Sequence, residues 1–135
     1  MPEKPRNLLD SYAVMALAKR EPGFEKVKTN LQHARKTGQP VLMNEINIGE
    51  VYYSLAREWS LEQADRFLSS FLLLPVERVH NSYEDILEAA RIKARFRLSF
   101  ADAFAVATAL RSKAVILTGD REFEAVAGLV KIEWL

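Results

Sequence analysis

Residues 114–117 read AVIL and lead directly into Thr118, Gly119 and Asp120. A short apolar run with β-branched residues that stops at a glycine predicts a buried strand followed by a turn. Residues 7–10, NLLD, repeat this pattern in a shorter form, again with an aspartate at the end. Both stretches are therefore expected to be strands of one sheet, each with an acid at its carboxyl end.

Helical patterns alternate with further short apolar runs along the chain. Strands separated by helices need crossover connections, which are right-handed and produce a parallel sheet covered on both faces. The sequence therefore predicts a three-layer α/β/α fold, and its 135 residues favour a single domain over 1–135. Further strands are expected at 41–43, 76–80 and 130–133, and helices at 11–19, 24–36, 46–57, 61–74, 82–95, 100–111 and from Arg121.

The composition excludes several kinds of site. The chain has no cysteine, which rules out disulfides, thiolate zinc ligands and a cysteine nucleophile. Its two histidines, His33 and His80, have no ligand partner at a useful spacing, and both are expected to be structural. A net charge of +1 does not indicate a protein that coats nucleic acid. No apolar run has the length of a signal peptide or a membrane span, so a cytoplasmic protein is expected.

Three aspartates are candidates for chemistry. Asp10 and Asp120 follow predicted strands, at the sheet edge where ligands of parallel sheets collect, but each also precedes a helix and fits an N-cap. Asp102 has only small or apolar neighbours on its side of the predicted helix, and a buried acid requires compensation. The alternative for Asp102 is a capping box with Ser99.

Helical periodicity places Glu50 differently. The apolar stripe of helix 46–57 lies on the side opposite this residue, so periodicity alone predicts that Glu50 is a solvated surface residue. The side chains expected next to Glu50 are Ile46, Asn47, Tyr53, Ser54 and Arg57, and the stripe is Ile48, Val51, Tyr52 and Leu55.

Carboxylates that meet at one point repel one another, and this raises their pKa values. A hard divalent cation such as Mg²⁺ or Mn²⁺ removes that penalty, generates a nucleophile from water and neutralises a phosphodiester in its transition state. These acids therefore suggest a metal site with oxygen ligands. Chain spacing alone does not show that they meet.

The sequence resembles the PIN-domain family, in particular the VapC ribonuclease toxins of type II VapBC toxin–antitoxin pairs, over nearly its whole length. Four stretches carry the resemblance, and each contains one acid of the family pattern. They are LLDSYAV with Asp10, NEINIGEVYYSLARE with Glu50, LSFADAFAVATAL with Asp102 and LTGDREF with Asp120. Periodicity alone predicts that Glu50 is a solvated surface residue, whereas the resemblance implies that it is one of the four site acids.

The resemblance implies a PIN-like fold and a metal-dependent endoribonuclease that hydrolyses RNA phosphodiesters by a metal-activated water. Asp10, Asp102 and Asp120 would hold one or two Mg²⁺ or Mn²⁺ ions, and Glu50 would be a further ligand or orient water. Thr118 and Ser11 are candidates to supply hydroxyls to the acids. Their alternative is a local helix-cap bond, which is favoured for Ser11.

Partners are the remaining expectation. Four cations within seven residues, Arg91, Lys93, Arg95 and Arg97, are the candidate RNA contacts, although cations near a helix C-terminus also complement its dipole. The resemblance implies a homodimer and a cognate antitoxin whose tail covers the acidic site. No membrane partner is expected.

Three other functions fit parts of the pattern. A phosphoacceptor receiver domain needs an aspartate after the third strand, where the chain has His80, and a lysine after the fifth, where residues 132–135 read IEWL. A haloacid-dehalogenase-type phosphatase needs an aspartate two residues after Asp10, where the chain has Tyr12. A non-catalytic PIN-fold interaction module would be indicated by a missing acid, and none is missing.

Overall fold

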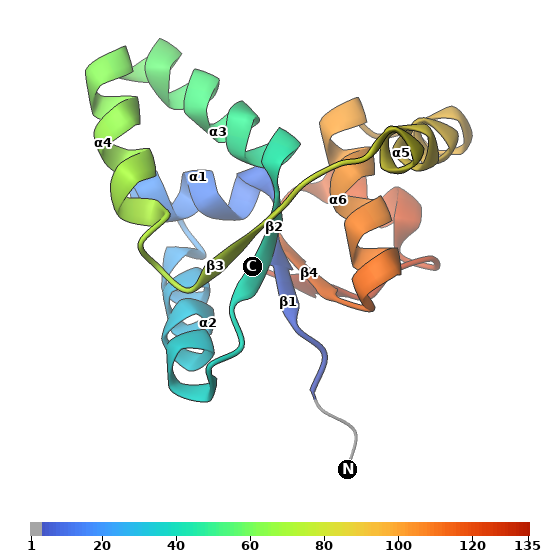
Figure 1. Ribbon diagram of the computed structural model, residues 1–135, viewed down its shortest axis with the longest axis horizontal. Coiled ribbons are helices and arrows are strands. Elements are labelled where there is room, and N and C mark those ends of the chain that lie inside the picture. The colour runs from blue at the N-terminus through green and yellow to red at the C-terminus, as the bar shows by residue number, and fades with distance from the viewer. Residues whose placement is uncertain (1–3) are drawn as a thin grey trace.

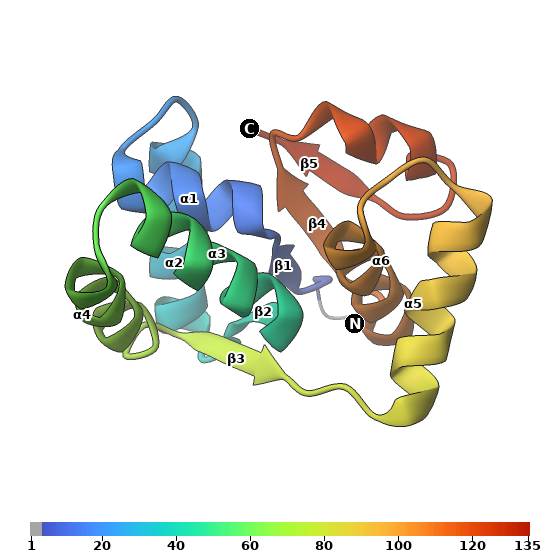
Figure 2. The same ribbon diagram turned by 90° about the horizontal axis from the view of Figure 1, so that it is seen from above.

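Five strands form one sheet in the order β3-β2-β1-β4-β5, and every neighbouring pair is parallel (Figure 1 and Figure 2). The computed structural model describes residues 4–135 and confirms the predicted α/β/α fold. The strands are β1 (Asn7–Leu9), β2 (Val41–Asn44), β3 (Val76–Val79), β4 (Val115–Thr118) and β5 (Ile132–Trp134). The helices are α1 (Ser11–Lys19), α2 (Phe24–Thr37), α3 (Glu45–Glu58), α4 (Leu61–Phe71), α5 (Tyr83–Arg95), α6 (Phe100–Ser112) and the 3₁₀ helix η1 (Arg121–Val126).

The alternation of side chains along the strands divides the core into two halves. Leu8 of β1 and Ile116 of β4 pack against α5, α6 and η1. The next residues, Leu9 and Leu117, point to the opposite face and pack against the layer formed by α1 to α4. Figure 2 shows these two helical layers on either side of the sheet. Because both faces are covered, the inner strands β1, β2 and β4 are mostly apolar, whereas the edge strands β3 and β5 also carry charged residues.

Two element boundaries differ from the prediction by more than one residue. Helix α4 ends at Phe71 rather than Leu74, because Pro75 disfavours helical geometry at the residue before it and the chain leaves in short turns. The last strand spans Ile132–Trp134, two residues later at its start than predicted. The helix predicted from Arg121 is present, as a single 3₁₀ segment.

The strand order positions the candidate site. From β1 the sheet grows through β2 to β3 in one direction, while β4 and β5 extend it in the other. The carboxyl ends of β1 and β4 therefore flank the point at which the strand order reverses, where open α/β sheets bind their ligands. Asp10 follows β1 directly and Asp120 follows β4. Within residues 4–135, no helix has the length and apolar character needed to cross a bilayer.

Candidate metal centre

Asp10 is completely buried at the end of β1. Its Oδ1 accepts a hydrogen bond from the backbone N–H of Ala13 at 2.9 Å and so caps α1. Its Oδ2 accepts from the hydroxyl of Thr118, the last residue of β4. The predicted cap is thus formed, and the same carboxylate also links the ends of the two central strands.

Thr118 connects Asp10 to Asp120. Its Oγ1 donates to Asp10 and accepts the backbone N–H of Asp120 at 3.0 Å, so it makes both the contact to an acid and the local bond that the sequence allowed. Asp120 in turn caps η1, since its Oδ1 accepts from the N–H of Glu122 at 2.9 Å. Its Oδ2 makes no hydrogen bond to the described part of the chain, so it remains available to a ligand.

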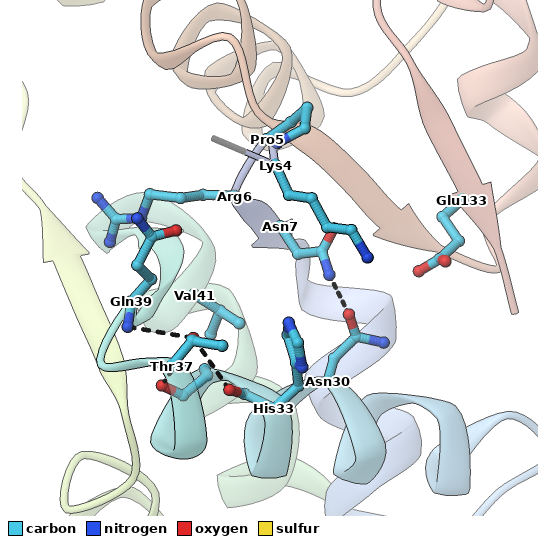
Figure 3. Close-up of a pocket in the computed structure, with 11 residues that line it drawn as sticks. Lys4, Pro5, Arg6, Asn7, Asn30, His33, Thr37, Gln39, Val41 and Glu133 are labelled. Atoms are coloured by element: carbon cyan, nitrogen blue, oxygen red, sulfur yellow. Dashed lines mark hydrogen bonds between the residues drawn. The ribbon is translucent and has the colours of Figure 1, made fainter. Parts of the chain in front are cut away.

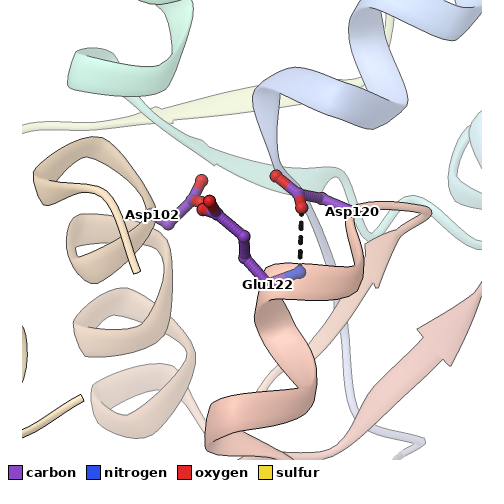
Figure 4. A group of neighbouring side chains, drawn as sticks. All are labelled: Asp102, Asp120 and Glu122. Atoms are coloured by element: carbon purple, nitrogen blue, oxygen red, sulfur yellow. Dashed lines mark hydrogen bonds between the residues drawn. The ribbon is translucent and has the colours of Figure 1, made fainter. Parts of the chain in front are cut away.

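Asp102 is 4% exposed on the first turn of α6, as predicted from its apolar neighbours. The Ser99 hydroxyl accepts its backbone N–H at 3.1 Å, but the return bond that would complete a capping box is not formed. The carboxylate points instead toward Asp120 and Glu122, as Figure 4 shows. One oxygen from each of these three acids lies within 4.8 Å of the others.

Glu122 is a site residue that the sequence reasoning missed. It is exposed in the first turn of η1. An acid at that place is ordinarily explained by the helix dipole. The available signal was its spacing from Asp120, which places both carboxylates at the start of one short helix. Within residues 4–135 the Glu122 carboxylate has no cationic partner.

Glu50 is half-buried, so the prediction of a solvated residue is wrong. The hydroxyl of Ser11 donates to its Oε1, which is a contact to an acid rather than the local cap bond favoured for Ser11. Periodicity failed because α1 and α6 also pack against α3, where they cover Asn47 and part of Glu50 while Ile46 and Tyr53 stay exposed. The charge of Glu50 contributes to raising the pKa values of Asp10 and Asp102.

Burial gives two of these acids pKa values far above their ordinary 3.8. Desolvation raises the pKa of Asp10 to about 7, against the lowering effect of its bonds to Thr118 and Ala13. Desolvation, followed by the charges of Asp10 and Asp120, raises the pKa of Asp102 to about 8. Neither carboxylate forms an ion pair within residues 4–135, and a bound cation would supply the missing positive charge. A donor set made only of carboxylates fits a hard divalent cation such as Mg²⁺ or Mn²⁺ and lacks the thiolate and imidazole ligands typical of zinc sites.

Asn47, on α3, is a second feature that the sequence did not reveal. It is completely buried, and its Nδ2 donates to the carbonyl of Ala101, the residue before Asp102, at 3.0 Å. Its Oδ1 is buried and lacks a donor within the described residues. Hydrated Mg²⁺ brings water molecules that can donate to such an acceptor, so this orphaned atom is also compatible with a cation site.

The basic stretch lies apart from the acids. Arg91, Lys93 and Arg95 are exposed on the last two turns of α5, and Arg97 is exposed in the connection to α6. None of these cations forms an ion pair in the described structure with the five acids Asp10, Glu50, Asp102, Asp120 and Glu122. The connection leads directly to the turn of α6 that carries Asp102, which is compatible with a path for a polyanion toward the acids.

A hollow in the described structure lies away from the acids. It measures about 770 Å³ and lies beside the amino ends of β1 and β2, between Asn7, α2 and Glu133 (Figure 3). None of the five acids lines it. His33 lines this hollow, and His80 contacts Glu45 at 2.6 Å, so neither histidine takes part in the acidic cluster.

A model of the PIN domain matches residues 8–129. The chain belongs to the PIN-domain family. This assignment places it among nucleases, and all five acids lie within the matched residues.

Solved structures share the fold at low sequence identity. VapBC2 from Rickettsia felis, bound to a DNA fragment from its promoter, superposes with a TM-score of 0.77 at 16% identity, covering 96% of this chain and 98% of that one. VapC20 from Mycobacterium tuberculosis, a toxin that cleaves the sarcin–ricin loop, gives 0.74 at 20% identity, with coverage of 94% and 98%. VapBC from Salmonella typhimurium bound to DNA gives 0.74 at 19% identity, with coverage of 96% and 98%. No curated protein sequence matches this chain at a significant level.

Proposed function

We propose that this chain is a single-domain endoribonuclease that depends on Mg²⁺ or Mn²⁺ and acts as the toxin of a type II toxin–antitoxin pair. The observation that carries the proposal is the gathering of five carboxylates at the switch point of the sheet. They come from four separate places in the chain, and within residues 4–135 no lysine, arginine or histidine pairs with any of them. The acids concerned are Asp10, Glu50, Asp102, Asp120 and Glu122.

Asp10, Asp102 and Asp120 would hold the cation, with Glu122 close to Asp102 and Asp120 and with Glu50 close enough to affect Asp10 and Asp102. Thr118 fixes the Asp10 carboxylate by its hydroxyl, and Ser11 does the same for Glu50. These bonds keep the ligand oxygens in place without cancelling their charge. When bound, a hard divalent cation supplies an activated water and neutralises the negative charge that develops on a phosphodiester.

The partners belong to the same proposal. The solved relatives include VapBC complexes, which supports a cognate antitoxin for this chain. Trp59, Leu61 and Leu73 are apolar side chains exposed at the two ends of α4, where they offer surface to an antitoxin or to a second copy of the chain. The substrate is RNA, and the place of action is the cytoplasm.

Expression in a bacterial host tests the toxin proposal. Induction of the wild-type chain is expected to arrest growth, and Asp120→Asn is expected to relieve the arrest, because asparagine keeps the cap of η1 but removes the charge. Asp65→Asn is the matched control, since Asp65 is exposed on α4 and only accepts a bond from Tyr52. Equal growth arrest by wild type and Asp120→Asn would contradict the proposal.

A further inference from the structure

Tyr12 is an aromatic side chain that the core does not use. It lies two residues after Asp10 in the first turn of α1 and is 45% exposed, while Ala13 and Val14 beside it fill the core. Its hydroxyl makes no hydrogen bond within residues 4–135. A large ring left open to solvent next to a cluster of acids therefore has no evident structural role.

Gly119 makes room for this ring. A Cβ placed on Gly119 would lie 2.4 Å from Cε1 and 2.9 Å from Cζ of Tyr12, closer than side-chain atoms approach in proteins. Gly119 does not have a positive φ, so its backbone conformation does not demand glycine. The contact with the ring is the constraint. Tyr12 thus rests against the turn that carries Asp120, with its other side open.

The charges around this turn limit what can bind there. Asp10 and Asp120 flank the ring along the two chain segments, and both are acids. Arg121 is the cation next to Asp120 in sequence, but it pairs with Glu124 at 3.1 Å and lies over the ring of Trp134. A phosphate chain is therefore repelled here except where a cation bridges it to the acids, and further affinity has to come from uncharged contacts.

We propose that Tyr12 stacks on an unpaired base of the RNA, immediately beside the phosphodiester held at the acids. This inference rests on the proposed ribonuclease function. An aromatic face stacks on any of the four bases when the nucleotide is unpaired, and this contact needs no positive charge. RNA is favoured over a protein partner because the chain segments that meet at the ring, residues 10–12 and 119–120, carry two acids of the proposed cleavage site. The ring would hold the nucleotide next to the cleaved bond.

A cycle of protein and RNA changes tests the stack. The probe is a synthetic oligoribonucleotide that carries the cleavage site mapped with wild-type protein, together with a copy in which the nucleotide beside the cleaved bond is abasic. Tyr12→Ala is expected to slow single-turnover cleavage of the intact RNA roughly 10-fold, with Tyr12→Phe close to wild type. The abasic RNA should be cut at the same low rate by wild type and Tyr12→Ala, because both changes remove one contact.

Two controls complete the test. Tyr83→Ala removes another exposed tyrosine, on α5, and should leave both rates unchanged. Gly119→Ala should slow wild type by displacing the ring, yet add little in the Tyr12→Ala background. If Tyr12→Ala and the abasic site reduced the cleavage rate independently, so that their fold effects multiplied, the stacking proposal would be overturned. It would also be overturned if Tyr12→Ala left RNA cleavage unchanged and weakened only the binding of a protein partner. Absence of any RNA cleavage by wild type would instead overturn the ribonuclease function itself.

Discussion

Replacing Asp102 by asparagine should stabilise the metal-free protein at neutral and alkaline pH. Asp102 is 4% exposed, and burial together with its acidic neighbours raises its pKa from 3.8 to about 8. Between these two values the folded chain keeps a proton that the unfolded chain loses. The stabilising contribution of this proton is therefore complete below about pH 4, and it is lost as the pH rises toward about 8. Asparagine does not ionise, so the Asp102→Asn variant should not lose stability at this position as the pH rises.

The magnitude follows from the two pKa values. The gap between 3.8 and about 8 corresponds to at most about 6 kcal/mol, and relaxation and water entry at a site that opens to solvent reduce this value. We expect Asp102→Asn to gain about 1–3 kcal/mol at about pH 8 and almost nothing near pH 4. For a chain of this size that gain raises the melting temperature by roughly 3–10 °C.

Thermal unfolding in chelator and in Mn²⁺ measures the effect across pH. Wild type should gain stability from Mn²⁺, whereas Asp102→Asn should gain little. Asp85→Asn is the control of opposite sign, because the Ser82 N–H and Arg111 lower the pKa of Asp85. It should lose stability above the ordinary aspartate pKa and lose less as the pH falls. An Asp102→Asn variant with no gain at about pH 8 and full Mn²⁺ stabilisation would refute the reasoning.

Three further predictions concern proton release on metal binding, the role of Glu122 and the basic stretch. Mn²⁺ binding at neutral pH should release roughly one to one and a half protons per chain, because Asp10 and Asp102 titrate near 7 and 8, and calorimetry in buffers of different ionisation enthalpy measures this. Glu122→Gln should weaken Mn²⁺ binding by about 10-fold with an unchanged melting temperature in chelator; an unchanged binding constant would remove Glu122 from the site. Reversing the charge of Arg97 should raise KM for RNA and reduce the salt dependence of binding, with kcat nearly constant, and a change confined to kcat would exclude phosphate contact.

Much of the fold follows from local patterns in the sequence. The glycine turn after residues 114–117 and the aspartate after residues 7–9 mark the ends of β4 and β1, and Gly38 ends α2 in left-handed geometry. Strand order and register depend on contacts between distant segments, such as Leu8 with Ile116, which local periodicity does not encode.

The candidate site divides in the same way. Burial of Asp102 was predictable from its small and apolar helical neighbours, because those residues lie on the same helix. Burial of Glu50 was not, since it depends on α1 and α6 packing against the flanks of α3. Glu122 was missed because an exposed acid in a first helical turn has an ordinary explanation, and only its distance from Asp102 sets it apart. The contact from Ser11 to Glu50 likewise crosses 39 positions in sequence.

Cleavage of defined RNA by purified protein, in Mn²⁺ and in chelator, tests the central claim most directly. The carboxylates at the ends of β1 and β4 are proposed to act through a bound cation, so wild type should cut RNA in Mn²⁺ and leave 5′-phosphate and 3′-hydroxyl ends. Asp10→Asn should cut at least roughly 100-fold more slowly. Chelator should stop the reaction, and added Mn²⁺ should restore it. Undiminished cleavage in chelator by protein that elemental analysis shows to be metal-free, or wild-type cleavage by Asp10→Asn, would contradict the account.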